Sequence, residues 1–232
     1  MSTKMKRAAL LSILLMVALA VAGADNELND REKAEGWLLL FDGKTLNGWI
    51  TSSFRPSLVP VDKGCINPHK CGGYMMMPEK IWSDFILSLD YKTSKDCNSG
   101  VLLRAYPLID VPGQGVGYHA IEMQIEEKEQ TGYYATGALY DLVPVHKKVG
   151  KPVGEWNHAE ITCDKNLIKV VINGEEVSRM DLDEWREPHK RPDGSSHKFN
   201  FAFKEHSRKG YIGLQDHGAP VWFKNIKLKP LM

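Results

Sequence analysis

The chain has 232 residues, of which 30 are Lys or Arg and 29 are Asp or Glu, so its formal net charge is +1. A balance this close to neutral, with no basic stripe, excludes a protein that binds nucleic acid through charge. The chain also has no Gly-rich nucleotide fingerprint, so we expect no nucleotide cofactor.

The first 24 residues have the features of a secretory signal peptide. Three basic residues precede an apolar run from Ala8 to Val21, and this run ends at the small residues Ala22-Gly-Ala24. The run is shorter than the roughly 20 residues that a membrane-spanning helix needs. No Cys follows the cleavage site. We therefore expect the mature chain, residues 25–232, to be secreted or periplasmic, with no membrane span once the leader is removed.

Four cysteines suggest disulfides in such an oxidising compartment. Cys65, Cys71, Cys97 and Cys163 permit two bridges in three connectivities. Cys65 and Cys71 flank a short loop that contains Pro and Gly, which makes them the candidate pair. Four free buried thiols are the alternative, above all for Cys163 within an apolar strand. No pair has the spacing of a zinc site.

Short runs that alternate between apolar and polar residues predict β-strands along the mature chain. The clearest are residues 85–91, 120–126, 167–172, 211–217 and 226–229. Asn173-Gly174 follows the third run and predicts a type I′ hairpin turn. Two polar stretches, residues 106–117 and 181–206, read as long loops, the second with a short helix near residues 182–186. Many short strands and no linker predict a single all-β sandwich domain.

Polar side chains share one face of two of these strands. Glu122 and Gln124 lie opposite Ile121 and Met123, and Gln215 and His217 lie opposite Ile212 and Leu214. Carboxylate, amide and imidazole groups in such rows can bind sugar hydroxyls and move protons. A solvated outer face is the alternative for the carboxylates, and a hydrogen-bonded turn is the alternative for His217.

Several motifs resemble, in order, those of the family once called domain of unknown function 1080. They are Gly36-Trp-Leu-Leu-Leu-Phe-Asp-Gly-Lys-Thr-Leu-Asn-Gly-Trp49, Asn98-Ser-Gly-Val-Leu-Leu-Arg104, Gly137-Ala-Leu-Tyr-Asp141, Gly154-Glu-Trp-Asn157, Asn173-Gly174 and Gly210-Tyr-Ile-Gly-Leu-Gln-Asp-His-Gly218. That resemblance implies a concanavalin A-like jelly-roll β-sandwich with one concave face. It also implies 3-keto-glucoside lyase and hydratase activity, with a separate sugar 3-dehydrogenase as functional partner.

The resemblance implies a base, an acid and a group that stabilises an enolate. Glu122 and His217 are the candidate base and acid in either order, and Arg104 and Gln215 are candidates to stabilise charge. A divalent metal bound by Glu122 and His217 could replace Arg104 as electrophile. The remaining candidates for substrate contact are Gln124, Asp216, Tyr140 and Trp222.

Plainer roles are open for several of these residues. Arg104 could form a salt bridge to Glu122, and Asp216 could orient backbone. Tyr140 and Trp222 could be packing residues.

Two other functions compete with this prediction. A non-catalytic carbohydrate-binding module is possible because the fold alone does not decide function. A glycoside hydrolase would use two carboxylates, most simply Glu122 and Glu127, about 5–5.5 Å apart in a retaining enzyme. Gln124 stands where such an enzyme has a middle acid.

Overall fold

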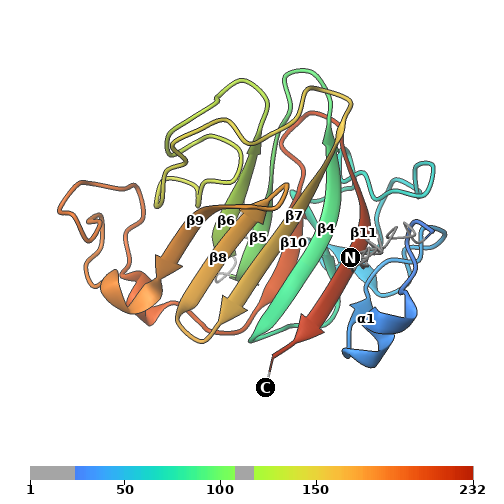
Figure 1. Cartoon of the computed structure of the whole chain (residues 1–232), viewed down its shortest axis with the longest axis horizontal. Coiled ribbons are helices and arrows are strands. Elements are labelled where there is room, and N and C mark those ends of the chain that lie inside the picture. Colours follow the sequence, from blue (N-terminus) through green and yellow to red (C-terminus); the bar gives the residue numbers. More distant parts are fainter. Residues whose placement is uncertain (1–23, 108–117, 232) are drawn as a thin grey trace, which may run out of the picture.

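The computed structural model describes residues 24–107 and 118–231, which form two packed antiparallel sheets (Figure 1). The six-stranded sheet has the order β1 (Leu38–Leu39), β11 (Val221–Pro230), β4 (Phe85–Thr93), β7 (Trp156–Asp164), β8 (Leu167–Ile172), β9 (Glu175–Asp181). The five-stranded sheet has the order β2 (Trp49–Thr51), β3 (Met75–Pro78), β10 (Tyr211–Gln215), β5 (Asn98–Pro107), β6 (Tyr118–Glu126). All but the last residue of the predicted signal peptide lie outside the described residues, as does most of the predicted 106–117 loop.

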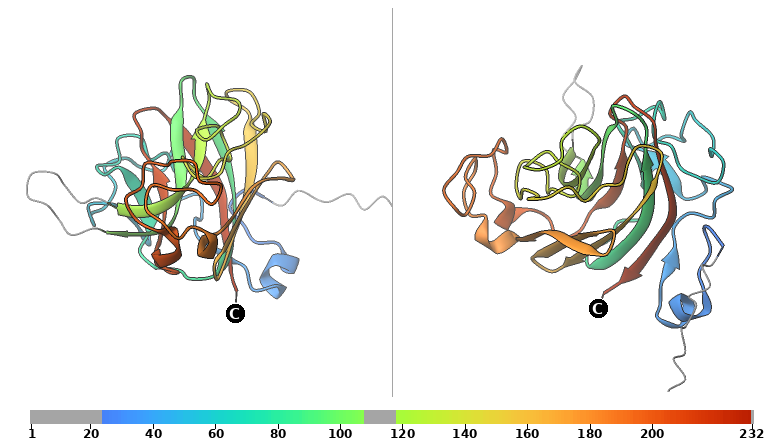
Figure 2. Two further views of the ribbon diagram at one scale, coloured as in Figure 1. Left: turned by 90° about the vertical axis from the view of Figure 1, so that its left-hand side faces the viewer. Right: turned by 45° about the horizontal axis from the view of Figure 1, so that its top comes forward.

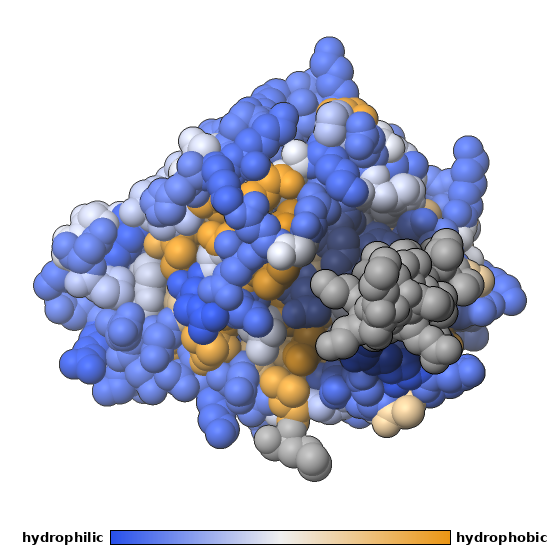
Figure 3. Space-filling model, viewed as in Figure 1, coloured by the Kyte–Doolittle hydropathy of each residue, from blue (hydrophilic) through white to orange (hydrophobic). Residues whose placement is uncertain are grey.

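The core lies between the sheets because the strands alternate as their sequences predict. Buried and partly exposed residues alternate along all of β4. Its inward side chains, such as Leu87 and Leu89, share one core with Val101 of β5, Ile121 of β6 and Ile212 of β10. The prediction of an all-β jelly-roll sandwich is confirmed. Figure 3 shows that the surface in the view of Figure 1 is mostly hydrophilic, with apolar side chains in places.

The predicted hairpin is confirmed between β8 and β9. Asn173 has φ 53° and Gly174 has φ 85°, the left-handed pair that a type I′ turn requires. The six residues of β8 pair with β9 from Leu167↔Asp181 to Ile172↔Glu175. The turn thereby fixes the register at this edge of the six-stranded sheet.

Helices are few and short in the described residues. The helix α1 (Asp30–Ala34) is capped by Asn29, which forms a capping box with Glu32. The short helix predicted near residues 182–186 is a 3₁₀ turn, η1 (Leu182–Glu184), and a second such turn is η2 (Phe203–Glu205). No helix in this part of the chain is long and apolar enough to cross a membrane.

Arg104 does not point where a regular strand would place it. Its φ is 49°, and the pairing of β5 with both neighbouring strands shifts register around it. Such a bulge turns the side chain away from the face that simple alternation predicts. The guanidinium is 0% exposed and donates to the Ser83 and Lys165 carbonyls at 3.2 and 2.7 Å and to Asp84 Oδ1 at 2.9 Å.

The predicted Cys65–Cys71 disulfide is wrong. All four cysteines are free and buried. Cys71 belongs to the core between the sheets and its thiol donates to the Gly73 carbonyl at 3.3 Å, whereas Cys65 lies outside that core and bonds the Lys63 carbonyl. The two thiols therefore face different surroundings.

Candidate functional site

The candidate site lies on the face of the five-stranded sheet that points away from the six-stranded sheet. Ile121, Met123 and Ile125 of β6 point into the core, so Glu122 and Gln124 between them point outward. Ile212 and Leu214 of β10 likewise turn inward, which leaves Gln215 on the outer face. The polar rows read from the sequence thus belong to two strands of one sheet.

A pocket of about 120 Å³ opens on this outer face, and we call it the sheet-face pocket. Its lining residues come from β5, β6, β10 and three loops, and they are Asn98, Glu122, Gln124, Tyr140, Lys198, Gln215 and His217. Five of them are residues that the sequence predicts for the site: Glu122, Gln124, Tyr140, Gln215 and His217. The sequence prediction missed Lys198 and assigned no role to Asn98.

Tyr140 reaches the pocket because its segment pairs with the free edge of β6. The Tyr140 N–H donates to the Glu122 carbonyl at 2.9 Å, and the Gln124 N–H donates to the Ala138 carbonyl at 2.9 Å. Main-chain pairing of this kind fixes the segment against the strand that carries the carboxylate. The ring of Tyr140 therefore borders the same pocket as Glu122.

Glu122 is the one carboxylate among the residues that line the pocket. Burial raises its pKa from 4.5 to about 7, although the positive charge of Lys198 and a hydrogen bond from Gln215 act in the opposite direction. Burial wins because the charged carboxylate loses more hydration than these two groups return. A carboxyl that titrates near neutral pH can both take up and release a proton during a reaction.

Two buried amide oxygens in the pocket have no hydrogen-bond partner within residues 24–107 and 118–231. They are Oε1 of Gln124, which is 1% exposed, and Oε1 of Gln215, which is 8% exposed. Buried acceptors without a donor cost free energy, so native proteins rarely leave them unmatched. Two such oxygens beside a carboxylate suit a ligand that donates two hydroxyl hydrogens.

Gly100 makes room for the Glu122 side chain. Gly100 lies opposite Gln124 in the β5–β6 ladder, and a Cβ there would collide with Glu122 Oε1 and lie 2.7 Å from its Cγ. Any larger residue would therefore push the carboxylate out of its place in the pocket.

We expect Gly100→Ala to reduce kcat about 10²-fold, since a displacement of about 1 Å in an active site costs that much. The matched control is Gly150→Ala, because a Cβ at Gly150 meets only ordinary contacts with Thr136. Steady-state kinetics and melting temperatures of both variants check this. Wild-type kcat in Gly100→Ala would show that the position of Glu122 does not matter.

Three predicted site residues lie elsewhere. Arg104 is sealed among Ser83, Asp84 and Lys165, so both its predicted role beside the substrate and its alternative salt bridge to Glu122 are wrong. Trp222 is on β11 of the other sheet, where its Nε1 donates to Asp62 Oδ2 at 2.6 Å.

Asp216 does not line the sheet-face pocket either. It accepts from the Lys70 N–H at 2.8 Å and the Gly218 N–H at 3.0 Å and lies 3.2 Å from His69 Nδ1. Asp216 therefore orients backbone, the alternative role that the sequence left open for it.

The described residues do not form a zinc-type centre of His, Cys, Asp and Glu side chains. No group of three or more His, Cys, Asp or Glu side chains that could hold a metal occurs in residues 24–107 and 118–231. The sheet-face pocket supplies Glu122 and His217, and its other charged group is the ammonium of Lys198. Catalytic zinc sites use three protein ligands. We therefore derive no step through a metal.

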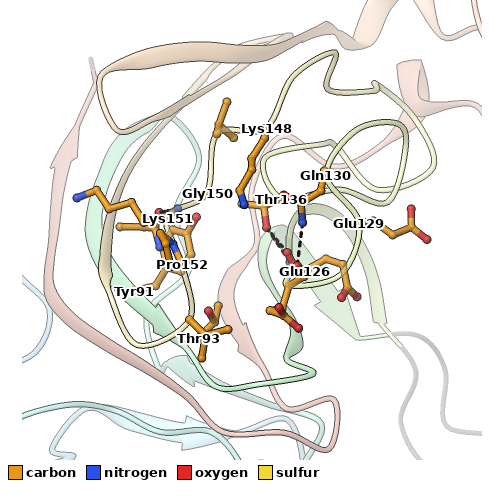
Figure 4. Close-up of a pocket in the computed structure, with 14 residues that line it drawn as sticks. Tyr91, Thr93, Glu126, Glu129, Gln130, Thr136, Lys148, Gly150, Lys151 and Pro152 are labelled. Atoms are coloured by element: carbon orange, nitrogen blue, oxygen red, sulfur yellow. Dashed lines mark hydrogen bonds between the residues drawn. The ribbon is translucent and has the colours of Figure 1, made fainter.

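A second pocket, of about 80 Å³, lies at one end of the sandwich (Figure 4). Two of its carboxylates accept from backbone N–H groups: Glu126 accepts from the Lys128 N–H at 2.9 Å, and Glu127 accepts from the Asp96 N–H at 3.2 Å. Glu127 thus lines this end pocket and not the sheet-face pocket. Among the described residues that line the sheet-face pocket, Glu122 consequently has no second carboxylate beside it.

Comparisons with known proteins identify the family and the fold. A family model described as the 3-keto-alpha-glucoside-1,2-lyase-like domain matches residues 36–229. A protein of Bacteroides thetaiotaomicron named 3-keto-disaccharide hydrolase is 29% identical over 231 residues, which cover 85% of this chain and 79% of that protein.

Two crystal structures of candidate glycosyl hydrolases from Parabacteroides distasonis share the fold. One has a TM-score of 0.74 and 26% identity, and covers 90% of this chain and 100% of its own. The other has a TM-score of 0.66 and 31% identity, and covers 84% of this chain and 99% of its own.

Proposed function

Because the chain belongs to the family of 3-keto-alpha-glucoside-1,2-lyase-like domains and is thus a carbohydrate-active enzyme, we propose that it cleaves 3-keto-glucosides by elimination and hydration. The family resemblance seen in the motifs is thereby confirmed. The observation that carries the proposal is a single partly buried carboxylate, Glu122, whose pKa is raised to about 7, beside two amide oxygens that have no partner among the described residues.

The reaction uses the acidity of the hydrogen at C2, which lies next to the C3 carbonyl. The Glu122 carboxylate takes that proton, and the electron pair forms an enolate on the C3 oxygen. The enolate re-forms the ketone as the C1–O bond breaks, which leaves a C1–C2 double bond, and the departing alkoxide takes up a proton. Water then adds its hydroxyl to C1 and a proton to C2, so the net reaction is hydrolysis.

Residues of the sheet-face pocket are placed to transfer the protons and to bind the sugar in this reaction. Glu122 takes the C2 proton, exchanges it with solvent, and delivers a solvent proton to C2 in the hydration step. Oε1 of Gln124 and Oε1 of Gln215 accept hydrogens from sugar hydroxyls, which binds and orients the ring. His217 is exposed at the pocket and is the candidate acid for the departing oxygen. Oxidation of C3 is then the task of a separate sugar 3-dehydrogenase.

The two rival functions make different demands. A two-carboxylate hydrolase needs a second acid near Glu122, and Glu127 lies at the end pocket instead. A binding module would hold sugar without turnover, so it has no use for a carboxylate whose pKa is raised to about 7. Both observations favour the elimination mechanism.

The test is to incubate the mature protein with one glucoside in its plain and its 3-keto form, with and without EDTA. We expect release of the C1 substituent from the 3-keto form alone, at the same rate with EDTA. Cleavage of the plain glucoside would contradict the proposal in favour of a hydrolase, and sugar binding without any release would support the binding module.

The pH dependence follows from the raised pKa of Glu122. A base must be deprotonated in the free enzyme, so kcat/KM on a 3-keto-glucoside should rise with pH up to about 7 and fall about tenfold per pH unit below it. Lys198, Tyr140 and His217 are the other titratable groups facing Glu122. We expect His217→Gln to keep this acidic limb, and its loss in that variant would assign the base to His217.

A further inference from the structure

Lys198 brings a positive charge to the sheet-face pocket from the 182–206 segment, which has little regular structure. Its Nζ lies 4.0 Å from the ring centroid of Tyr140 and 5.2 Å from that of Phe199. No ion pair of Lys198 occurs within residues 24–107 and 118–231, whereas Lys190, in the same segment, pairs with Glu187 at 3.0 Å. The ammonium rests on aromatic faces and keeps its donors available.

Asp141 fixes the backbone that carries this lysine. Asp141 Oδ2 accepts from the Lys198 N–H at 2.8 Å, and Asp141 Oδ1 pairs with Arg191 Nη2 at 2.7 Å. Asp141 and Arg191 are 6% and 8% exposed, and the guanidinium lies 3.9 Å from the centroid of Tyr133. The 133–143 and 182–206 segments therefore lie side by side, as Figure 2 shows.

Tyr140, on which the ammonium rests, is itself tied to β6. Its N–H donates to the main-chain carbonyl of Glu122 at 2.9 Å. Lys198 is thus held by two groups of the 133–143 segment, the Asp141 carboxylate and the Tyr140 ring. This segment pairs with β6, the strand that carries Glu122. This arrangement holds the cation at a set position relative to Glu122.

Lys198 and Glu122 line one pocket but do not form an ion pair in the described residues. The charge of Lys198 lowers the pKa of Glu122, and burial outweighs it. A cation and a carboxyl that face one space without neutralising each other leave room for a substrate atom between them. The substrate of the proposed reaction develops negative charge on its C3 oxygen while it loses the proton at C2.

We propose that Lys198 is the catalytic electrophile of this enzyme, and that its ammonium donates a hydrogen bond to the C3 oxygen as Glu122 removes the C2 proton. This role rests on the proposed function, and it gives Lys198 the charge-stabilising role that the sequence suggested for Arg104. The ammonium stabilises the enolate and keeps its proton throughout, so no atom is transferred to or from the lysine. Binding of the sugar covers the exposed side chain and strengthens the interaction.

The test compares Lys198→Met with Lys204→Met. Lys204 lies in the same segment but is exposed and does not line the pocket. We expect Lys198→Met to reduce kcat on a 3-keto-glucoside by about 10²–10³-fold, as loss of one oxyanion donor does, with KM changed little. Lys198→Arg should recover part of that rate, and Lys204→Met should equal wild type.

A second readout separates catalysis from mere support of the loop. Removal of the cation should move the acidic limb of the kcat/KM profile to higher pH in Lys198→Met, because the charge that lowers the Glu122 pKa is gone. Its melting temperature should stay that of wild type, since the side chain is exposed. Wild-type kcat and an unmoved limb in Lys198→Met would overturn the role of Lys198 while leaving the function intact. A wild-type protein inactive on every 3-keto-glucoside would overturn both.

Discussion

Glu122→Gln is expected to reduce kcat on a 3-keto-glucoside by about 10²–10⁴-fold, the contribution that a positioned general base makes. The amide keeps the size of the side chain but cannot accept the C2 proton. The other polar side chains of the sheet-face pocket stay in place, so KM should change far less than kcat. Steady-state kinetics with the keto-glucoside measure both constants.

The matched control for this variant is Glu127→Gln. Glu127 is five residues along the chain but lines the end pocket, where it accepts from the Asp96 N–H. We expect its kcat to equal that of wild type. Equal losses in the two variants would indicate a pair of carboxylates and would contradict the mechanism.

Glu122→Gln should also change how stability depends on pH. The pKa of Glu122 rises from 4.5 to about 7 on folding, so between these values the folded protein binds more protons than the unfolded chain. Stability from this group is therefore fully present below about pH 4.5 and is lost as pH rises through about 7. The Gln variant lacks this loss, so its melting temperature should exceed that of wild type at pH 8 and match it at pH 4. Equal melting temperatures at pH 8 would mean that Glu122 is not held in a buried site.

Arg104→Met is expected to destabilise the fold by about 3–5 kcal/mol, the usual result when one partner of a buried ion pair is removed. Arg104 is wholly buried, and its loss would leave the Ser83 and Lys165 carbonyls and Asp84 without these donors. For a chain of this size, a loss of that order lowers the melting temperature by roughly 10 °C. Thermal unfolding followed by circular dichroism measures it.

Arg179→Met is the comparison for Arg104→Met. Arg179 pairs with Glu176 at 2.8 Å on the surface, where both side chains are about half exposed. An exposed pair contributes at most about 1 kcal/mol, so this variant should melt close to wild type. A stable but inactive Arg104→Met protein would restore the catalytic role that the sequence suggested for Arg104.

Regular strands made the fold and half of the site predictable. Successive side chains in a strand point to opposite faces, so alternation alone places Glu122, Gln124 and Gln215 on one face of the sheet. This placement does not depend on the conformation of the loops. The Asn173-Gly174 turn was readable for a similar reason, since few residues adopt its left-handed conformation. Arg104 does not follow the alternation of side chains, because a bulge at that residue turns its side chain to the other face. Nothing in the local sequence marks the bulge.

Lys198 shows the second limit of a single sequence. The lysine lies in a polar segment in which nothing local distinguishes it from Lys204 or Lys190. Its place in the pocket depends on the buried Asp141–Arg191 pair and on Tyr140, which are distant in sequence. Trp222 was misplaced for a comparable reason, because pattern alone does not tell which of two sheets a strand joins.

The most direct test of the mechanism is the reaction of the wild-type protein with a 3-keto-glucoside in D₂O, with the product sugar analysed by NMR. Elimination followed by hydration predicts one deuterium at C2 of the released 3-keto sugar, in excess of the exchange seen with Glu122→Gln as a blank. A product formed at the full rate with hydrogen retained at C2 would show that the C1–O bond breaks without removal of the C2 proton, and would contradict the account.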